Sequence, residues 1–420
     1  MIADTEATPI ADLDLAHLDW ETPEFAADPH LRFEAARDRH PWLARVNGGF
    51  VVHDLATIRE LLVQDDRLRT CFDGIVDLMG AHGTRWGRFA QEQMIALPER
   101  EHAVVRGAFA ARFTPRHANQ LRPVMRETMR RLLDEWAPRQ RIDFEEFASY
   151  YPVSVMAQMI GAPLDAIPAL RRSMETLGLA FSLDATMLPR LDAAMEQFDA
   201  FVFGLIEQRR KEPGDGTAQD LLDVLIETGA AQGINDRQLA DLLIFLFVAG
   251  YDTSKNVLTY TMNLLLDRQD IYERCAVDHA YCGKVIEEAL RLFTPGSTFR
   301  ATREDIVHRG VRIPAGTMLF FALGVSGQIS ADIENPHAFE PERRLEPHLR
   351  HVGFGLGRHM CLGQYIARAQ LHEGLHLIAQ RMRHPRKDGA NGWRPFPGVW
   401  GIDGLPIAFE TGAEGIVVRT

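Results

Sequence analysis

The chain has 420 residues, a formal net charge of -12 at pH 7 and 25% charged residues. A balance this acidic argues against nucleic acid as a partner, because neutralising phosphates requires a basic face. The four cysteines, Cys71, Cys275, Cys282 and Cys361, include no C-x-x-C pair. This usage suits the reducing cytoplasm rather than a disulfide-stabilised secreted fold.

The first segment, M-I-A-D-T-E-A-T-P-I-A-D, carries acids where a signal peptide carries lysine or arginine, and it lacks an apolar core. We expect residues 1–20 to be a loosely ordered extension. The longest apolar run, residues 242–249, is far shorter than the ~20 residues of a membrane-spanning helix. A cytoplasmic protein without a membrane anchor is therefore predicted.

Helical periodicity dominates residues 30–300, whereas residues 307–321 and 400–409 have the pattern of short strands and turns. No linker rich in proline, glycine or serine divides the chain into separately patterned blocks. These patterns predict a single domain, residues 1–420, that is mainly α with minor β sheets.

Residues 242–265 are predicted to form one long buried helix with polar residues in its middle. Asp252 and Thr253 place an acid and a hydroxyl inside it, directly after the small residues Ala249 and Gly250 and Tyr251. Aspartate and threonine compete for backbone hydrogen bonds and destabilise a buried helix unless they are paired. Such an interruption is often a functional site, the alternative being a plain core helix with a strained turn.

Two further patterns follow toward the C-terminus. Glu288 and Arg291 lie one turn apart in a helical pattern, a spacing that on its own is most often a surface ion pair. The segment F-G-L-G-R-H-M-C-L-G, residues 354–363, then places Cys361 behind a glycine-rich turn and just before another helical pattern. Glycine permits a tight loop, and a helix N-terminus favours a charged sulfur.

The segment H-E-G-L-H, residues 372–376, fits the zinc-binding pattern H-E-x-x-H, whose histidines lie one helical turn apart. A third ligand is hard to find, because Ala379 and Met382 occupy the positions where an extended zinc motif has glycine and histidine. His384 precedes a proline and is expected beyond the helix end. We therefore interpret this segment as an exposed helix face and not as a metal site.

Together these motifs resemble those of the cytochrome P450 superfamily, of the soluble bacterial type. F-G-x-G-R-H-x-C-x-G is similar to the haem-binding signature, and A-G-Y-D-T, residues 249–253, is similar to the oxygen-binding segment A-G-x-[DE]-T. Glu288-x-x-Arg291 and F-E-P-E-R lie between them in the order that the family requires. The resemblance extends from about residue 99 to about residue 409. Departures from the common pattern stand at Ser254, Gln370 and residues 326–329.

The resemblance implies the cytochrome P450 fold, with haem b (iron protoporphyrin IX) between the long central helix and the cysteine loop. Cys361 would be the axial ligand of the haem iron. Cations and donors for the two propionates are expected at His102, Arg106, Arg300 and His359. The other expected cofactor contacts are Ala249, Gly250, Phe354, Gly355 and Gly363.

The resemblance also implies roles for the remaining motif residues. Asp252 and Thr253 would relay protons to dioxygen and are the expected catalytic residues. A buried ion network that braces the cysteine loop is expected from Glu288, Arg291 and Arg343, with Arg344 as an adjacent candidate for the third position.

The expected substrate pocket is largely apolar, which suits a small terpenoid, aromatic or steroid-like molecule held by burial. By family position its residues are Phe245, Val248, Ala249, Gly296, Thr298, Trp400 and Ile402, with part of residues 72–89. Arg85 or Arg88 would bind a substrate carboxylate if either side chain points inward.

The implied activity is that of a monooxygenase, which hydroxylates a C–H bond with one oxygen atom from O2. A [2Fe-2S] ferredoxin and its reductase would supply electrons to a monomeric enzyme, and a basic patch near Cys361 would dock the ferredoxin unless these charges are simply solvated. The patch comprises Arg112, Arg116, Arg343, Arg344, Arg350 and Arg358. Two alternatives stay open: a peroxygenase, a class that typically has Arg-Pro in place of Asp252-Thr253, and a non-enzymatic haem-thiolate sensor, which needs neither residue.

Overall fold

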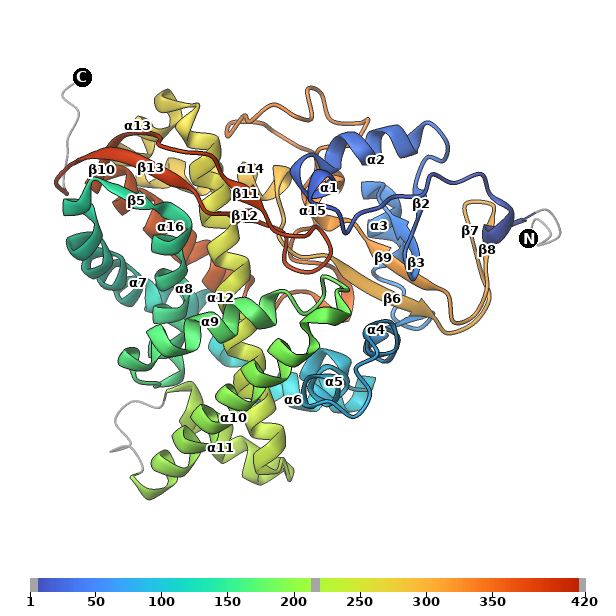
Figure 1. Ribbon diagram of the computed structural model, residues 1–420, viewed down its shortest axis with the longest axis horizontal. Helices are drawn as coiled ribbons and strands as arrows, with labels where there is room; N and C mark the ends of the chain where they lie inside the picture. The colour runs from blue at the N-terminus through green and yellow to red at the C-terminus, as the bar shows by residue number, and fades with distance from the viewer. Residues whose placement is uncertain (1–6, 213–219, 415–420) are drawn as a thin grey trace.

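The computed structural model, which describes residues 7–212 and 220–414, is a broad mass of helices with a smaller region of sheet at one side. In Figure 1 the helices fill the left and the bottom of the molecule, and strands β2, β3, β6 and β9 lie at the right. The fold class predicted from the sequence, mainly α with minor β sheets, is confirmed. Within the described ranges no helix is both long and apolar enough to cross a membrane.

The helices range from single turns to the 31-residue helix α12. Their bounds are α1 Pro23–Ala27, α2 Pro29–Arg37, α3 Leu55–Leu61, α4 Phe72–Met79, α5 Arg85–Glu92, α6 Glu99–Phe109, α7 Pro115–Trp136, α8 Phe144–Ile160, α9 Ile167–Gly178, α10 Leu188–Lys211, α11 Leu221–Gln232, α12 Asp236–Leu266, α13 Gln269–Val277, α14 His279–Leu292, α15 Leu323–Ser326 and α16 Gln364–Arg381.

The largest sheet has five strands in the order β2-β3-β9-β6-β4. Only the β3–β9 pair is parallel; the other three pairs in this sheet are antiparallel. The strands are β2 Leu43–Val46, β3 Gly49–Val52, β4 Leu68–Arg69, β6 Thr298–Thr302 and β9 Met318–Phe321. Strands β2, β3 and β4 lie in the part of the chain that the sequence pattern predicted as helical. Strands β2 and β3 form because Asn47-Gly48 makes a tight hairpin turn in which Gly48 has a φ of +83°, whereas β4 forms by pairing with β6.

Three smaller sheets complete the described strands. One has the order β1-β8-β7, a second β10-β13-β5, and the third pairs β11 with β12. Their strands are β1 Thr8–Pro9, β5 Arg141–Asp143, β7 Ile306–His308, β8 Val311–Ile313, β10 Met382–Lys387, β11 Gly392–Trp393, β12 Ile402–Asp403 and β13 Pro406–Thr411.

The N-terminal segment is more ordered than the sequence suggested. Residues 1–6 lie outside the described part of the chain, but residues 7–20 pack against it, because β1 pairs with β8 and Ile10, Leu15 and Trp20 are buried. The predicted loose extension over residues 1–20 is therefore wrong from residue 7 onward. Four apolar side chains in this stretch supply enough buried area to order it.

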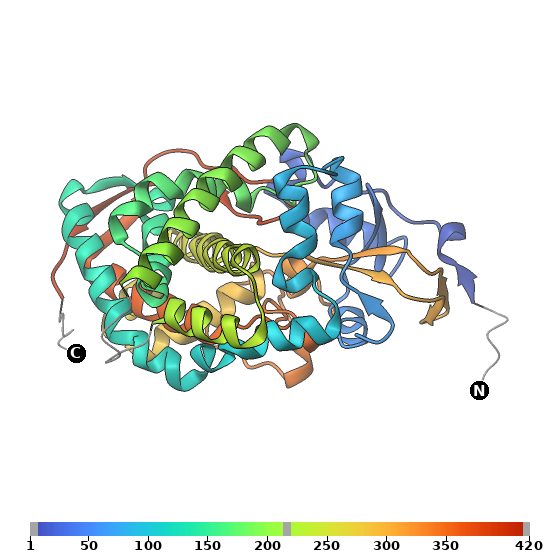
Figure 2. The same ribbon diagram turned by 90° about the horizontal axis from the view of Figure 1, so that it is seen from below.

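Helix α12 passes through the centre of the helical mass. In Figure 2 it is seen nearly end-on, with other helices around it. It packs against α8, α9, α10 and α14, and most of its side chains are buried. One apolar core draws residues from Leu18 to Phe409, which supports our proposal of a single domain. Residues in the middle of α12 are therefore surrounded by protein on every side except where a cavity opens.

The ion network expected from Glu288, Arg291 and Arg343 is assembled in the structure. Arg291 donates from Nε and Nη2 to the two carboxylate oxygens of Glu288 at 2.8 and 2.7 Å, and Arg343 donates from Nε at 3.2 Å. Arg291 also donates to the carbonyl oxygens of Gly327, Pro336 and Ala338. Arg344 is exposed and takes no part. The network thus ties the irregular segment after α15 to helix α14.

We expect Glu288→Gln to lower the free energy of unfolding by about 3 kcal/mol, because removing one partner of a buried ion network leaves the other charges uncompensated. Urea unfolding followed by circular dichroism measures this change. The control is Glu340→Gln, which removes a half-exposed carboxylate 3.0 Å from the same Arg343 and should lower it by about 1 kcal/mol or less. Equal losses in the two variants would contradict the structural role of the network.

Candidate functional site

The cysteine loop is closed by its own backbone. The N–H of Cys361 donates to the carbonyl oxygen of Phe354 at 2.7 Å, and Gly355 and Gly357 both have a φ of +69°. A side chain at residue 357 would lie 2.7 Å from a backbone oxygen of α3's C-terminal end, so only glycine fits there. Helix α16 begins at Gln364, as the sequence predicted, and places Cys361 just before its N-terminus.

The sulfur of Cys361 opens into a cavity although protein surrounds it. Burial raises the pKa of the Cys361 thiol, and the N–H of Gly363 and the charge of Arg106 offset this only in part. The thiolate is therefore favoured only when a cation faces the sulfur from the cavity side. A metal ion held in the cavity would have this effect.

A cavity of about 350 Å³ lies between α12 and the cysteine loop. Ala249, Gly250 and Thr253 of α12 line one side of it. The opposite side contains the predicted cofactor contacts Phe354, Gly355, His359, Cys361 and Gly363, and Arg300 of β6 lies at its rim. A side chain at Gly250 would lie 2.3 Å from the methyl carbon of Met156 on α8, so the end of that flexible side chain would have to move.

One end of this cavity carries positive or protonatable groups without matching anions. The rings of His102 and His359 lie 4.5 Å apart, and both ring nitrogens of His102 are buried without a partner. Burial and then the charge of Arg300 lower the pKa of His359 to about 3. Arg300 is 6% exposed and donates at 2.8 Å to the Thr298 hydroxyl and to a backbone oxygen, but it forms no ion pair within the described residues.

A group with two carboxylates fits this end of the cavity, because it would satisfy the histidine nitrogens and the guanidinium that protein atoms leave unpaired. A group of this kind that also placed a metal cation opposite the sulfur of Cys361 would meet both demands. His102 and Arg106 do not line the cavity itself. Arg106 donates to the carbonyl oxygen of Met360 at 2.6 Å, and so holds the cysteine loop from outside.

The predicted acid and alcohol of α12 point to different places. Thr253 lines the cavity, and its hydroxyl donates to the carbonyl oxygen of Ala249 at 2.9 Å. Asp252 lines neither this cavity nor the substrate cavity described next. Its carboxylate oxygens accept from Arg394 at 2.6 and 2.7 Å, and the ammonium of Lys255 lies 3.1 Å away. The expectation that both side chains face dioxygen is therefore corrected for Asp252.

Electrostatics explain why a carboxylate is stable inside α12. Burial alone would raise the pKa of Asp252, but the charges of Arg394 and Lys255 lower it below its usual value. Asp252 is therefore an anion held by two cations in this conformation. The helix runs through this point without interruption, because the ion pairs replace the strained turn that the sequence suggested.

A second cavity of about 280 Å³ continues from the first and shares Phe245, Ala249, Thr253, Gly296 and Thr298 with it. Five of the seven predicted substrate-pocket residues line it, namely Phe245, Val248, Ala249, Gly296 and Thr298. From residues 72–89 it is lined by Phe72, Ile75, Trp86 and Phe89.

Two residues predicted for the pocket wall lie behind it. Trp400 donates from Nε1 to the carbonyl oxygen of Ala26 at 2.9 Å and packs on Phe293. Ile402 is fully buried in β12. The wall is instead formed by Pro397, Gly398 and Val399, which Trp400 supports. The residues that line the cavity thus stand just before the predicted Trp400 in the chain.

Other lining residues had no signal in the sequence. The aromatic side chains Trp20, Phe181 and Phe320 come from three distant segments, and Phe181 lies where the family resemblance is weakest. Gln93 is a buried amide among them and donates from Nε2 to the carbonyl oxygen of Ala90 at 3.2 Å. Only the fold brings these residues together.

Neither arginine proposed as a carboxylate anchor reaches the substrate cavity. Arg85 donates from Nε and Nη2 to the two carboxylate oxygens of Asp199 on α10, both at 2.8 Å, and also pairs with Asp241 on α12. Arg88 is exposed. Both roles are therefore corrected, and Arg85 instead fastens α5, which carries Trp86 and Phe89, to its neighbours.

The segment H-E-G-L-H on α16 is a helix face, but it is packed against neighbouring elements and not exposed as the sequence suggested, with Glu373 only 1% exposed. His376 meets the carbonyl oxygen of Cys275 at 2.8 Å, and His372 meets that of His279. Glu373 is paired with Arg122 at 2.8 Å. Among the described residues no group of three or more histidine, cysteine, aspartate or glutamate side chains is placed to hold a metal ion.

Comparison with known proteins places these features in a family. The model of the family described as Cytochrome P450 matches residues 172–391. The chain is 31% identical over 406 residues to luteothin monooxygenase of Streptomyces thioluteus, covering 94% of this chain and 96% of the relative. It is 28% identical to pentalenic acid synthase of Streptomyces avermitilis, with 91% and 94% covered.

Solved structures give the same fold. The crystal structure of P450BioI in complex with an acyl carrier protein superposes with a TM-score of 0.81 at 23% identity, covering 92% of this chain and 100% of that one. The crystal structure of CalO2 gives 0.83, also at 23% identity, with 95% and 100% covered. At this identity the likeness shows the fold alone.

We expect Arg300→Gln to weaken haem retention about tenfold, because the amide cannot replace the charge-assisted hydrogen bonds of a guanidinium to a propionate. The rate of haem transfer to an excess of apomyoglobin measures this loss. Arg303→Gln is the matched control, since Arg303 lies three residues further along, at the end of the same strand, and is exposed. Unchanged transfer rates in both variants would contradict a propionate site at Arg300.

Proposed function

The chain belongs to the cytochrome P450 family, and from this premise we propose that it hydroxylates a small apolar organic molecule with O2 as a haem-thiolate monooxygenase. The observation that carries the proposal is one continuous space. The sulfur of Cys361 and the hydroxyl of Thr253 line its first part, and aromatic side chains line its second part. The balanced reaction is RH + O2 + two electrons + two protons → ROH + water.

Enzymes of this family are oxidoreductases that use haem b, and we propose that Cys361 is the axial ligand of its iron. When bound, the haem supplies the redox chemistry that activates dioxygen, and a thiolate ligand favours O–O cleavage. Arg300, His102 and His359 would hold the propionates. The backbone of the cysteine loop keeps the sulfur in place and closes that side of the site to water.

Thr253 is the proposed proton donor inside the cavity. Its hydroxyl faces the shared space of the two cavities, and its hydrogen bond to the Ala249 carbonyl can be exchanged for one to a bound molecule. Asp252, the next residue toward the N-terminus, is the proposed source of the proton. For this the carboxylate must be protonated and turn from Arg394 toward Thr253.

We propose that the substrate is apolar and carries at least one aryl ring. The rings of Phe72, Phe181 and Phe299 lie within 6.0 Å of one another in edge or tilted arrangements, which are the geometries that a further ring can join. Gln93 and Thr298 are among the polar groups that line the cavity and could orient it, together with Thr70 and Ser297. Relatives named luteothin monooxygenase and mycinamicin IV hydroxylase/epoxidase support a secondary metabolite as substrate.

A ferredoxin is the proposed electron donor to a monomeric cytoplasmic enzyme. Met360 and Tyr365, which flank the cysteine loop, are 37% and 41% exposed, and Arg116, Arg344 and Arg350 are exposed. An exposed apolar centre with a basic rim suits an acidic iron–sulfur protein. Arg343 and Arg358 are less available, because they pair with Glu288 and Glu99.

The test of the proposed function is the carbon monoxide difference spectrum of the dithionite-reduced protein. We expect the strongly red-shifted Soret band of thiolate-ligated haem, and we expect Cys361→Ser to lose that band because an alcohol is not deprotonated as a thiol is. Cys275→Ser is the control, since Cys275 is buried away from the cavity, and it should keep the band. Absence of haem from the parent protein would overturn the proposal.

Thr253→Ala should leave haem binding intact and divert electrons from product to hydrogen peroxide, because the hydroxyl that passes protons inside the cavity is lost. The ratio of peroxide released to NADPH consumed, with ferredoxin and its reductase present, measures the diversion, and we expect it to rise several-fold. Thr259→Ala, two turns further along α12 and fully buried away from the cavity, should leave the ratio unchanged. An unchanged ratio of peroxide to NADPH in Thr253→Ala would contradict the proposed role of Thr253.

A further inference from the structure

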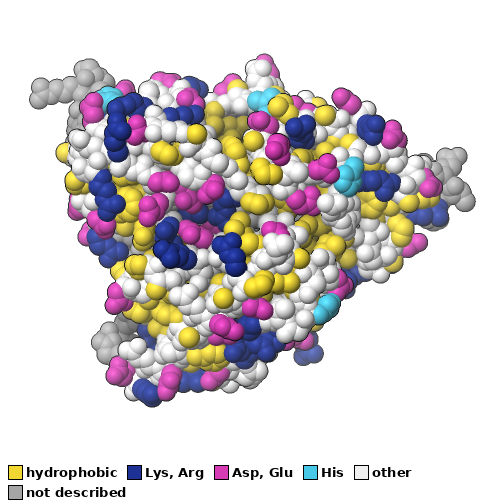
Figure 3. Space-filling view, in the orientation of Figure 1, with side chains coloured by type: hydrophobic (Ala, Val, Ile, Leu, Met, Phe, Trp, Pro, Cys, Tyr) yellow, Lys and Arg dark blue, Asp and Glu magenta, His cyan; other side chains and the backbone are white. Residues whose placement is uncertain are grey.

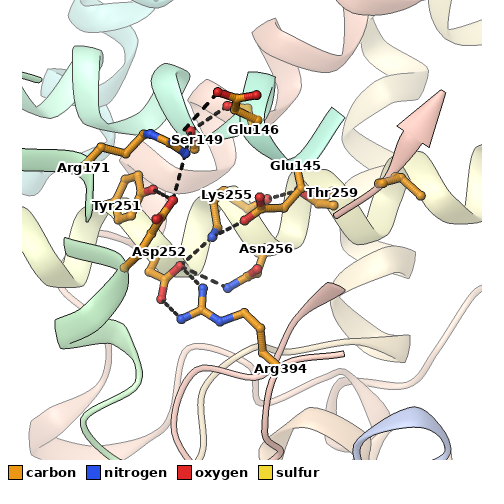
Figure 4. Close-up of polar contacts among 12 residues, drawn as sticks. Glu145, Glu146, Ser149, Arg171, Tyr251, Asp252, Lys255, Asn256, Thr259 and Arg394 are labelled. Carbon is orange, nitrogen blue, oxygen red and sulfur yellow. Dashed lines mark hydrogen bonds and ion pairs between the residues drawn. The ribbon is translucent and has the colours of Figure 1, made fainter. Parts of the chain in front are cut away.

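The carboxylate of Asp252 faces a buried ion network instead of the cavity. Figure 4 shows it at the meeting point of three side chains: Lys255 and Asn256 from the next turn of α12, and Arg394 from the C-terminal part of the chain. The side chains of Asp252 and Lys255 are each 1% exposed. Charges buried this deeply are rare unless they serve a purpose that an apolar packing would not.

Two contacts connect this carboxylate with helix α8. The ammonium of Lys255 lies 3.1 Å from Oδ1 of Asp252 and donates to Oε1 of Glu145 at 2.5 Å. Lys255 thus bridges two carboxylates, one of them fully buried and the other 14% exposed. Burial raises the pKa of Glu145, and the charge of Lys255 does not fully offset it. This brings proton uptake by Glu145 closer to neutral pH.

Glu145 opens to solvent through a polar cleft of about 620 Å³, which Lys255 and Arg394 also line. In Figure 3 basic and acidic side chains gather around a hollow in the region of α8 and α9. The other ionisable groups of this cleft are Asp143, Glu146, Arg171, Arg172, Glu175, Arg190 and Asp403. A line of polar contacts therefore runs from solvent to Asp252, on the side of α12 away from the haem cavity.

The rest of the surroundings of Asp252 is sealed by close packing. A side chain at Gly178, the last residue of α9, would lie 1.9 Å from Oδ2 of Asp252. One at Gly401 would lie 2.2 Å from Oδ1 of Asn256. Backbone therefore covers the ion network on these two sides, which leaves the Glu145–Lys255 pair as a defined path between Asp252 and the cleft.

We propose that Glu145 and Lys255 form the proton inlet of this enzyme, and that Arg394 is a positioning residue that holds Asp252 at the inner end of the inlet. The proposal rests on the proposed monooxygenase function, because that reaction consumes two protons inside a closed site. It extends that function from the acid and alcohol of α12 to residues on α8 and in the C-terminal segment.

The proton steps balance without any further reactant. A water molecule in the cleft, acting as a hydronium donor, protonates the Glu145 carboxylate. The Lys255 ammonium gives one proton to the Asp252 carboxylate and takes the one from Glu145. Glu145 and Lys255 return to their starting charges, and Asp252 becomes a neutral carboxylic acid.

Arg394 makes this transfer directional. It holds Asp252 by charge, so protonation weakens the bidentate pair and frees the neutral acid to turn toward Thr253. When the acid has given up its proton in the cavity, the restored anion returns to Arg394. The same arginine donates its backbone N–H to the carbonyl oxygen of Gly401 at 2.8 Å, so its position is fixed by the segment that also forms the pocket wall.

The experiment compares holoenzyme variants in the consumption of dioxygen, with NADPH, a plant-type ferredoxin and its reductase, in H2O and in D2O. Glu145→Gln keeps an oxygen acceptor for Lys255 but cannot carry a proton. The double variant Glu145→Gln, Lys255→Met removes one charge of each sign, so Asp252 and Arg394 remain a balanced pair and folding is protected. We expect both to consume dioxygen about tenfold more slowly, with a solvent isotope effect about twofold larger.

Glu146→Gln is the matched control. Glu146 is the next residue on α8 and lines the same cleft, but it reaches only Arg171, at 3.8 Å, and stands outside the Glu145–Lys255–Asp252 contacts. It should stay within about twofold of the parent in rate, with the same isotope effect. If all three variants had the rate and isotope effect of the parent, the proposed proton inlet would be wrong. A red-shifted carbon monoxide band in the same proteins would show that the proposed function does not fail with it.

An infrared readout separates a proton carrier from a merely structural pair. Between about pH 8 and about pH 5 the parent and Glu146→Gln should show the carbonyl stretch of one buried carboxylic acid that is missing in Glu145→Gln. Identical difference spectra in the three proteins would overturn the assignment of Glu145. A parent protein without haem would overturn both the inlet and the function on which it rests.

Discussion

The pairing of one buried carboxylate, Asp252, with Arg394 determines how the pocket is assembled. The two residues are 142 positions apart, and their bidentate contact fastens the C-terminal segment to the central helix. Helix α9 approaches the same point through Gly178, and the segments on either side of these contacts, residues 177–183 and 397–399, form part of the substrate cavity. An anion inside α12 therefore organises two walls of a cavity that it does not itself line.

A second constraint acts on the other side of α12. His102, His359 and Arg300 converge with Asp65 as the nearby carboxylate, but among the described residues none of the three forms an ion pair, and burial lowers the pKa of His359 to about 3. Cys361 lies across the same cavity with a thiol whose pKa burial raises. Both features are unfavourable alone and are relieved by one ligand that brings two carboxylates and a metal cation together. Haem is a ligand of this kind. The groups that would bind it lie on one side of α12, and the ion network of Asp252 lies on the other.

The sequence motifs and their order along the chain predicted much of the site. Most of the residues that they missed act through contacts between distant parts of the chain. The cysteine loop, Thr253 and the Glu288 network were located because each depends on residues a few positions apart. Arg394 and Glu145 carried no signal, because a side chain that pairs across more than a hundred residues leaves no local pattern. Lys255 lies one turn after Asp252, a spacing that on its own is that of an ordinary ion pair. The hairpin of β2 and β3 was missed, although Asn47-Gly48 is a common sequence signal of a hairpin turn. Trp400 was predicted to line the pocket but lies behind its wall, because an apolar residue that is buried in the core and one that lines a cavity look alike in a sequence.

The two buried ion networks of this protein differ in a way that bears on their purpose. Around Glu288 the partners are arginines, which keep their protons at any accessible pH, and their other donors end on backbone carbonyl oxygens or on the half-exposed Glu340, so this network can only hold structure together. Around Asp252 the line of charges continues through Lys255 to Glu145 and ends at solvent. Buried ion pairs seldom stabilise a fold more than well-packed apolar residues do. A network that reaches solvent through a lysine and a glutamate, both of which can exchange protons, is better explained by the movement of protons than by the stability of the fold.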